Sequence, residues 1–141
     1  MKQILKIEKE VQIRFNEVDS MGIVWHGHYA TYFEDAREEF GRHYDLDYLS
    51  IVGHGYYVPL VNLDFSFKSP LAYGDWAIVE ITYLPCEAAK ILFSYRILSA
   101  DKKTVMATGS STQVFLDSSM NLVLYAPEFY RKWQELHHVF D

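Results

Sequence analysis

The sequence predicts an α+β fold in which one long helix packs on an antiparallel sheet. A strand pattern opens the 141-residue chain, a helical pattern follows it, and most of the remainder alternates as strands separated by turns do. Because half of the residues are hydrophobic and only 23% are charged, wholesale disorder is not expected. The length suits a single domain, which we place over residues 1–141.

The first strand and the helix differ in the spacing of their apolar residues. Val11, Ile13 and Phe15 alternate with polar residues, which is the period of a half-buried strand. Apolar residues then recur at helical spacing and predict a helix over about residues 28–42. The apolar face of this helix consists of Tyr29, Tyr32, Phe33, Ala36 and Phe40.

Turn residues divide the rest of the chain. The segment with Gly53, Gly55 and Pro59 has no regular pattern and is expected to be a loop. Pro127 favours the first turn of a short C-terminal helix. The strand patterns between them cover residues 61–67, 76–84, 91–98 and 104–116. The apolar stripe of the C-terminal helix is Phe129, Tyr130, Trp133 and Leu136.

Composition and charge argue against several classes of protein. The net charge of −6 disfavours a nucleic-acid partner, because such a surface needs a basic patch. The single cysteine, Cys86, cannot form an internal disulfide and suits a reducing compartment. The N-terminal residues lack the apolar core of a signal peptide, and no stretch reaches the roughly 18 apolar residues that span a bilayer. We therefore expect a soluble, cytoplasmic protein.

The aromatic content predicts self-association. Aromatic residues make up 16% of the chain, and a sheet covered by one long helix leaves a face or an edge to be covered. Paired edge strands or a shared face in a homo-oligomer would cover it. The alternative is that the C-terminal helix and the loops cover the sheet completely.

The stretch between the first strand and the helix could hold an active site. Asp19 lies there, and Gly22 allows a sharp turn of the backbone. Backbone amides near His26 should point outward at the helix start, where they could hold a developing oxyanion. A carboxylate beside such amides suits acyl transfer. By residue type alone, however, Asp19 is also typical of a turn former, His26 of a surface histidine and Glu17 of a strand-end charge.

The motif "RFNEVDSMGIVWHGHYATYFEDAREEF" resembles the signature of hotdog-fold acyl-CoA thioesterases, in the branch of 4-hydroxybenzoyl-CoA thioesterase. The resemblance rests on the spacing of Asp19, the Gly-Ile-Val-Trp run, His26 and Tyr29, followed by "YFEDAR". A second, weaker block is "FKSPLAYGD". Together the two blocks extend the resemblance over about residues 10 to 120.

The resemblance implies a hotdog fold, a dimer or tetramer, and an acyl-CoA substrate bound at a subunit interface. It implies that Asp19 is the catalytic carboxylate, acting as nucleophile or general base on the thioester. It further implies that the backbone amides around His26 polarise the carbonyl and that His26 itself takes part in catalysis. No metal or organic cofactor is implied. The residues expected to contact the substrate are Trp25, Gly27 and Lys68, the last through a CoA phosphate. By residue type alone, however, Lys68 is more typical of an exposed lysine at the end of a strand.

Two positions depart from the family pattern. Phe15 stands where that branch often has a tyrosine, and Val18 stands where a threonine or cysteine is common. Neither departure removes the Asp19 carboxylate. Because of both departures, however, the family pattern does not indicate which acyl-CoA is the substrate. The cluster of Glu17, Asp19, His26 and His28 invites a metal site, although its spacing lacks the pattern of a dedicated zinc site.

The function predicted from the sequence is hydrolysis of an acyl-CoA thioester to a carboxylic acid and free CoA. The alternative is a non-hydrolytic hotdog binding or scaffold module, or a thioesterase acting on acyl carrier protein. The negative net charge disfavours docking of a carrier protein that is itself acidic. Among substitutions at the site, we expect loss of Asp19 to be the most severe, loss of His26 the second and loss of Glu17 the least.

Overall fold

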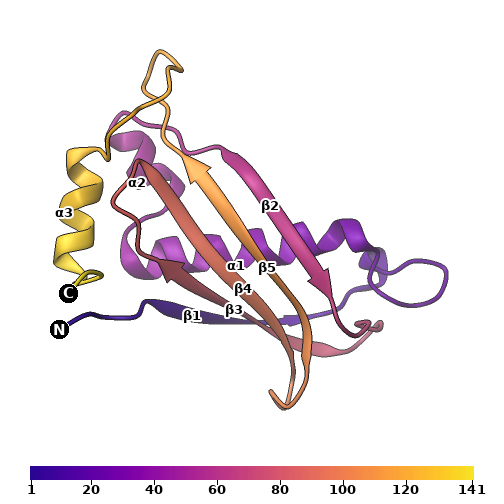
Figure 1. The fold of residues 1–141 in the computed structure, drawn as a ribbon. Helices are drawn as coiled ribbons and strands as arrows, with labels where there is room; N and C mark the ends of the chain where they lie inside the picture. The colour runs from indigo at the N-terminus through magenta and orange to yellow at the C-terminus, as the bar shows by residue number, and fades with distance from the viewer.

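The computed structural model describes all 141 residues and places five antiparallel strands in one curved sheet (Figure 1). Their order across the sheet is β1-β3-β4-β5-β2, so β1 and β2 are the two edge strands. The strands are β1 (Lys6–Gln12), β2 (Leu60–Phe67), β3 (Trp76–Leu84), β4 (Lys90–Ser99) and β5 (Val105–Val114). The antiparallel sheet predicted from the sequence is confirmed.

A single long helix crosses one face of this sheet (Figure 1). It is α1 (Tyr29–Tyr44), and the 3-10 turn η2 (His26–His28) leads directly into it. All five residues predicted for its apolar face are buried. The other helical elements are the 3-10 turn η1 (Phe15–Glu17), α2 (Tyr48–Gly53) and α3 (Glu128–Leu136). The α+β class and the position of the main helix are therefore as predicted.

The helix lies close to the sheet because β5 carries a glycine under it. Phe33 of α1 stacks on Tyr95 of β4, with ring centroids 4.2 Å apart and planes 4° apart. A Cβ atom at Gly109 would lie 2.5 Å from Cε2 of Phe33 and 2.3 Å from the carbonyl oxygen of Asp64. Any larger residue at position 109 would therefore push the helix away from the strands.

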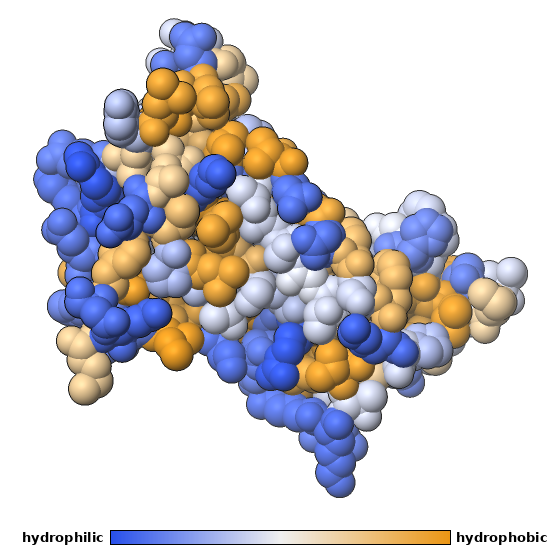
Figure 2. All heavy atoms as spheres, viewed as in Figure 1, coloured by the Kyte–Doolittle hydropathy of each residue, from blue (hydrophilic) through white to orange (hydrophobic).

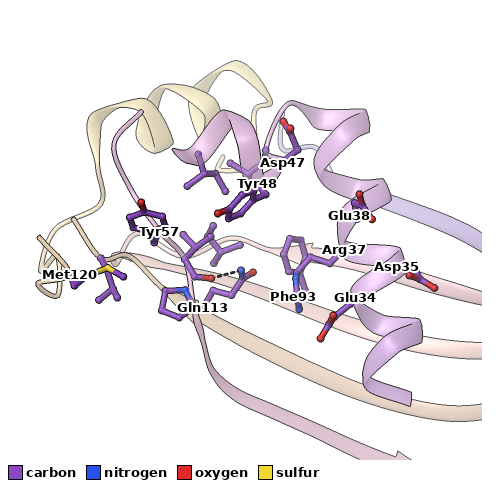
Figure 3. A pocket seen from close by; sticks show the side chains of 16 residues that line it. Glu34, Asp35, Arg37, Glu38, Asp47, Tyr48, Tyr57, Phe93, Gln113 and Met120 are labelled. Carbon is purple, nitrogen blue, oxygen red and sulfur yellow. Dashed lines mark hydrogen bonds between the residues drawn. The ribbon is translucent and has the colours of Figure 1, made fainter. Parts of the chain in front are cut away.

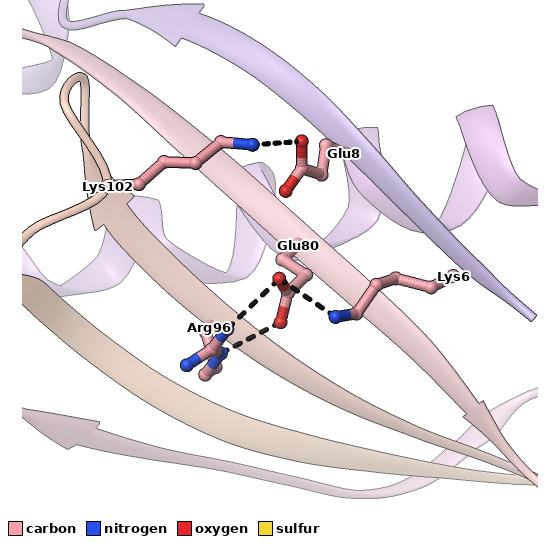
Figure 4. A network of polar contacts seen from close by, with 5 residues as sticks. All are labelled: Lys6, Glu8, Glu80, Arg96 and Lys102. Atoms are coloured by element: carbon pink, nitrogen blue, oxygen red, sulfur yellow. Dashed lines mark hydrogen bonds and ion pairs between the residues drawn. The ribbon is translucent and has the colours of Figure 1, made fainter. Parts of the chain in front are cut away.

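The middle of the opposite face of the sheet is polar, with apolar patches around it. Figure 2 shows weakly polar atoms across the middle of this face, where Ser94 of β4 pairs with Ser110 of β5. Beside them, Glu80 of β3 accepts hydrogen bonds from Arg96 of β4 at 2.8 and 3.1 Å and lies 3.3 Å from Nζ of Lys6 (Figure 4). The hydrogen bonds from Arg96 hold the pKa of Glu80 below its ordinary value.

Three details differ from the sequence predictions. The first strand ends at Gln12, so Phe15 falls in the turn η1 and is 77% exposed instead of packing inward. The segment expected to be a loop contains the short helix α2, which buries Ile51. Leu136 is exposed, because α3 directs Tyr130, Trp133 and Gln134 inward instead.

Candidate active site

Asp19 lies in a tight loop between β1 and α1. The loop closes where Val18 pairs with Val24, and the amide of Asp19 donates to the carbonyl of Ile23 at 2.8 Å. Within it, the amide of Gly22 donates to the carbonyl of Asp19 at 3.0 Å. Gly22 has φ +77°, a left-handed conformation that a residue with a Cβ atom adopts only with strain. The sharp turn predicted at Gly22 is confirmed.

The Asp19 carboxylate is only partly engaged in this turn. Its Oδ1 accepts a hydrogen bond from the amide of Met21 at 2.8 Å, which fixes the direction of the side chain. The other oxygen, Oδ2, makes no hydrogen bond within the chain, and the side chain is partly exposed. The same residue thus shapes the turn and presents a carboxylate oxygen to the outside.

The start of the long helix supplies hydrogen-bond donors close to this loop. The amide of His28 donates to the carbonyl of Trp25, and the amide of Tyr29 donates to that of His26. The amides of His26 and Gly27 have no acceptor in the chain, as expected for the first residues of a helix. With the helix dipole behind them, these two amides favour negative charge.

A cavity of about 380 Å³ joins Asp19 to the helix start. Asp19 and His26 both line it, and so does Lys68, which comes from the turn after β2. The cavity forms because the second sequence block packs beside the Asp19 loop. The amide of Val24 donates to the carbonyl of Leu71 at 2.8 Å. The other lining residues are Met21, Ile23, Val24, Tyr29, Phe67, Ser69 and Pro70.

Tyr29 and Phe67 form an aromatic wall of this cavity. Their ring centroids are 4.9 Å apart in an edge-to-face arrangement. Burial raises the pKa of the Tyr29 hydroxyl, so Tyr29 stays neutral at physiological pH. Phe67, Ser69 and Pro70 are cavity residues that the sequence did not single out individually, although the block "FKSPLAYGD" contains all three.

The structure brings together three of the five residues predicted for the site. Asp19, His26 and Lys68 share the cavity, whereas Trp25 and Gly27 do not line it. The Trp25 ring instead lies over Gly27, where an added Cβ atom would be 2.1 Å from the ring. A role for Trp25 and Gly27 in substrate binding therefore stays a prediction.

Glu17 is the one acidic residue of this region that is fully buried. It is 4% exposed and accepts hydrogen bonds from the amide of Arg14 at 2.8 Å and from the Tyr32 hydroxyl at 3.1 Å. The Arg14 guanidinium lies 3.3 Å from its other oxygen. Apart from the opposite charges of Arg14 and Glu17 three residues apart, nothing in the sequence indicates this burial.

A second cavity, of about 580 Å³, lies toward the other end of α1 between that helix, α2 and the sheet (Figure 3). It shares no lining residue with the Asp19 cavity. Its walls are largely apolar, and Arg37 reaches into it beside Phe93. Nη1 of Arg37 is buried without a hydrogen-bond partner. This larger cavity holds none of the residues that the sequence analysis predicted to be catalytic.

The four acidic and histidine residues considered for a metal do not form a metal site. No group of three or more His, Cys, Asp and Glu side chains is arranged to hold an ion.

None of the helices combines the length and the apolar character needed to cross a membrane.

A long helix laid across a curved antiparallel sheet, with a carboxylate in the loop before the helix, defines a protein of the hotdog class. A family model described as the thioesterase-like superfamily matches residues 13–134. The chain belongs to this superfamily and is a thioester hydrolase.

Individual proteins agree with this assignment. YneP of Bacillus subtilis, named as a candidate acyl-CoA thioesterase, is 31% identical over 104 residues, which are 73% of this chain and 75% of that protein. The crystal structure of TT1821 from Thermus thermophilus matches with a TM-score of 0.81 and 25% identity, covering 93% of this chain and 98% of that one. A 1,4-dihydroxy-2-naphthoyl-CoA thioesterase from Synechocystis shares the fold, with a TM-score of 0.80 and 19% identity over 91% of this chain and 94% of that one.

Proposed function

We propose that the protein hydrolyses an acyl-CoA thioester to a carboxylic acid and free CoA. The observation that carries this proposal is the shared cavity of Asp19 and the start of the long helix. The Asp19 oxygen that makes no hydrogen bond supplies a base or a nucleophile, and the free amide of His26 supplies an oxyanion site. The name of YneP supports CoA as the thiol carrier.

In the proposed reaction, the thioester carbonyl oxygen faces the free amide of His26 at the helix start. Asp19 either takes a proton from water, which then attacks the carbonyl carbon, or attacks that carbon itself to form an anhydride that water hydrolyses. In both routes the bond between the carbonyl carbon and sulfur breaks and the thiolate leaves. It takes the proton held by Asp19 in the first route and a proton from water in the second. Lys68 is exposed at the edge of the same cavity, where its ammonium group could meet a CoA phosphate.

The test of the proposal is thiol release from a panel of short, long and aromatic acyl-CoAs. Asp19→Asn keeps the size of the side chain and the contact with the Met21 amide but removes the charge and the basicity. We expect the rate to fall by at least about 100-fold, the scale for loss of a positioned acid–base group. Near-normal turnover of Asp19→Asn on the best substrate would reduce Asp19 to a turn former.

His26→Ala serves as the comparison within the same cavity. The substitution removes the imidazole but keeps the backbone amide, so we expect a smaller loss of activity than for Asp19→Asn. Circular dichroism and substrate binding measured on both variants establish that the fold and the affinity survive. A larger effect of His26→Ala would transfer the main catalytic role from Asp19 to the imidazole.

A further inference from the structure

We propose that Glu17 is a positioning residue, which holds the Asp19 loop in a fixed position relative to the start of the long helix. The proposal rests on the proposed function, because the group whose position Glu17 fixes is the Asp19 carboxylate. Only Val18 separates the two residues in the sequence, yet Glu17 is buried whereas Asp19 is partly exposed. The two carboxylates therefore have different environments and different tasks.

The contacts of Glu17 connect the two halves of the site. Its backbone carbonyl accepts the amide of Trp25, the residue just before the helix start, at 3.0 Å. Its side chain accepts the hydroxyl of Tyr32, which lies within α1, at 3.1 Å. One residue is thus bonded both to the segment that enters the helix and to the helix itself, while its own segment continues directly to Asp19.

The side chain is held strongly enough to serve as such a connection. Oε1 accepts both the amide of Arg14 and the hydroxyl of Tyr32, and Oε2 faces the Arg14 guanidinium. A buried carboxylate is costly unless donors satisfy it, so these three contacts favour one position of the Glu17 side chain. Burial and the neighbouring carboxylate raise the pKa of Tyr32, which keeps its hydroxyl protonated as a donor.

Glu17 does not act on the substrate directly. It is absent from the lining of the Asp19 cavity, and its side chain is only 5% exposed. Its effect must therefore pass through the geometry of Asp19 and the helix amides. A displacement of about 1 Å between catalytic groups can cost on the order of 100-fold in rate.

The experiment compares two substitutions of the same residue. Glu17→Gln keeps an oxygen that can accept from Arg14 and Tyr32, whereas Glu17→Ala removes both contacts. We expect Glu17→Ala to lower kcat by roughly 10- to 100-fold with KM changed by less than about threefold. Glu17→Gln should restore kcat to within about threefold of the wild type and leave the pH profile of kcat/KM unchanged. An equal loss in both variants, or a shifted profile in Glu17→Gln, would assign Glu17 a chemical role and overturn the proposal.

A pair of tyrosine variants separates positioning from general stability. Tyr32→Phe removes one buried hydroxyl that contacts Glu17, and Tyr83→Phe removes one that contacts Tyr130 at 2.5 Å on the far side of the core. Both should lower the melting temperature, but only Tyr32→Phe should lower kcat, by roughly 3- to 10-fold. Equal kcat values for the two variants would show that Glu17 matters only through stability, and the proposal would fail.

Amide hydrogen exchange tests the same connection without any substrate. The amide of Trp25, which donates to the Glu17 carbonyl, should exchange faster in Glu17→Ala and Tyr32→Phe than in Tyr83→Phe. Unchanged exchange in both site variants would overturn the proposal. If the wild type released no thiol from any acyl-CoA, the proposed function would fail, and the exchange measurement would still decide whether Glu17 orders the loop.

Discussion

At the scale of single residues, two carboxylates close in sequence take opposite environments. Glu17 is buried and its carboxylate accepts hydrogen bonds from three donors, whereas Asp19 has one oxygen without a hydrogen bond beside a cavity. From the sequence, we expected the loss of Glu17 to reduce activity less than the loss of His26. Because Glu17 is buried and His26 is exposed, we now expect Glu17→Ala to be the more harmful of the two for both folding and activity.

The left-handed backbone conformation of Gly22 can be tested by substitution. Its φ of +77° is the strained region for other residues, and no atom lies within 4 Å of the position that a Cβ would occupy. Gly22→Ala should therefore lower the free energy of unfolding by about 1 kcal/mol through the backbone alone, without a clash. Denaturant unfolding measures the change.

Gly53 provides the matched control. It ends α2 with an ordinary backbone conformation and also has open space around its Cβ position. Gly53→Ala should leave the free energy of unfolding equal to that of the wild type or raise it by up to about 1 kcal/mol. A loss as large as that of Gly22→Ala would mean that the conformation of Gly22 is not what requires glycine there.

At the scale of the elements, an ion cluster around Glu80 lies on the face of the sheet away from α1. Figure 4 shows Glu80 of β3 between Arg96 of β4 and Lys6 of β1, so that the cluster connects three adjacent strands. The Glu80 side chain is 8% exposed, whereas the side chains of both cations are about half exposed. The cluster therefore stabilises strand order only modestly, because solvent screens its cationic side.

The pH dependence of stability tests this cluster. The folded-state pKa of Glu80 is lowered, so its contribution is present above the ordinary pKa of 4.5 and is lost as the pH falls through the folded-state value. Glu80→Gln should lower the free energy of unfolding by about 1 kcal/mol near neutral pH. The difference in the free energy of unfolding between Glu80→Gln and the wild type should shrink as the pH falls below 4.5.

Denaturant titrations at several pH values measure this difference, with Glu87→Gln as the control. Glu87 is exposed and forms no ion pair, so its substitution should change little at any pH. If the difference for Glu80→Gln stayed constant down to strongly acidic pH, its charge would not be the stabilising feature.

At the scale of the whole molecule, the two edges of the sheet are unequal. Four of the seven residues of β1 are charged, which discourages pairing with another strand. Only Asp64 is charged among the eight residues of β2, and Val61 and Phe67 there are 60% and 54% exposed. The β2 edge is therefore where we expect a second copy of the chain to pair.

Sedimentation velocity tests this association. The wild type should sediment as a dimer or a larger species at micromolar concentration, and Val61→Lys should shift it toward the monomer, because a charge on an open edge opposes pairing. Gln12→Lys adds the same charge to β1 and should leave the sedimentation coefficient unchanged. A wild type that is an active monomer would contradict both the pairing and an active site at an interface.

The sequence determined the elements whose signal lies in near neighbours. The helical spacing from Tyr29 to Phe40 placed α1 and identified its buried face. A β-rich composition placed β3, and alternation placed β4, almost to the residue. The turn at Gly22 was likewise predicted from residue type, since few other residues tolerate its conformation.

Only the tertiary structure decided how distant segments meet. The sequence could not single out Phe67, Ser69 and Pro70 as walls of the Asp19 cavity, because those contacts depend on strand order and on where the turn after β2 lies. It could not tell that Glu17 is the buried carboxylate and Asp19 the accessible one, or that Trp25 covers Gly27 instead of lining the cavity. Local periodicity is set by residues three or four positions apart, whereas burial of a single charge is set by all the segments that pack around it.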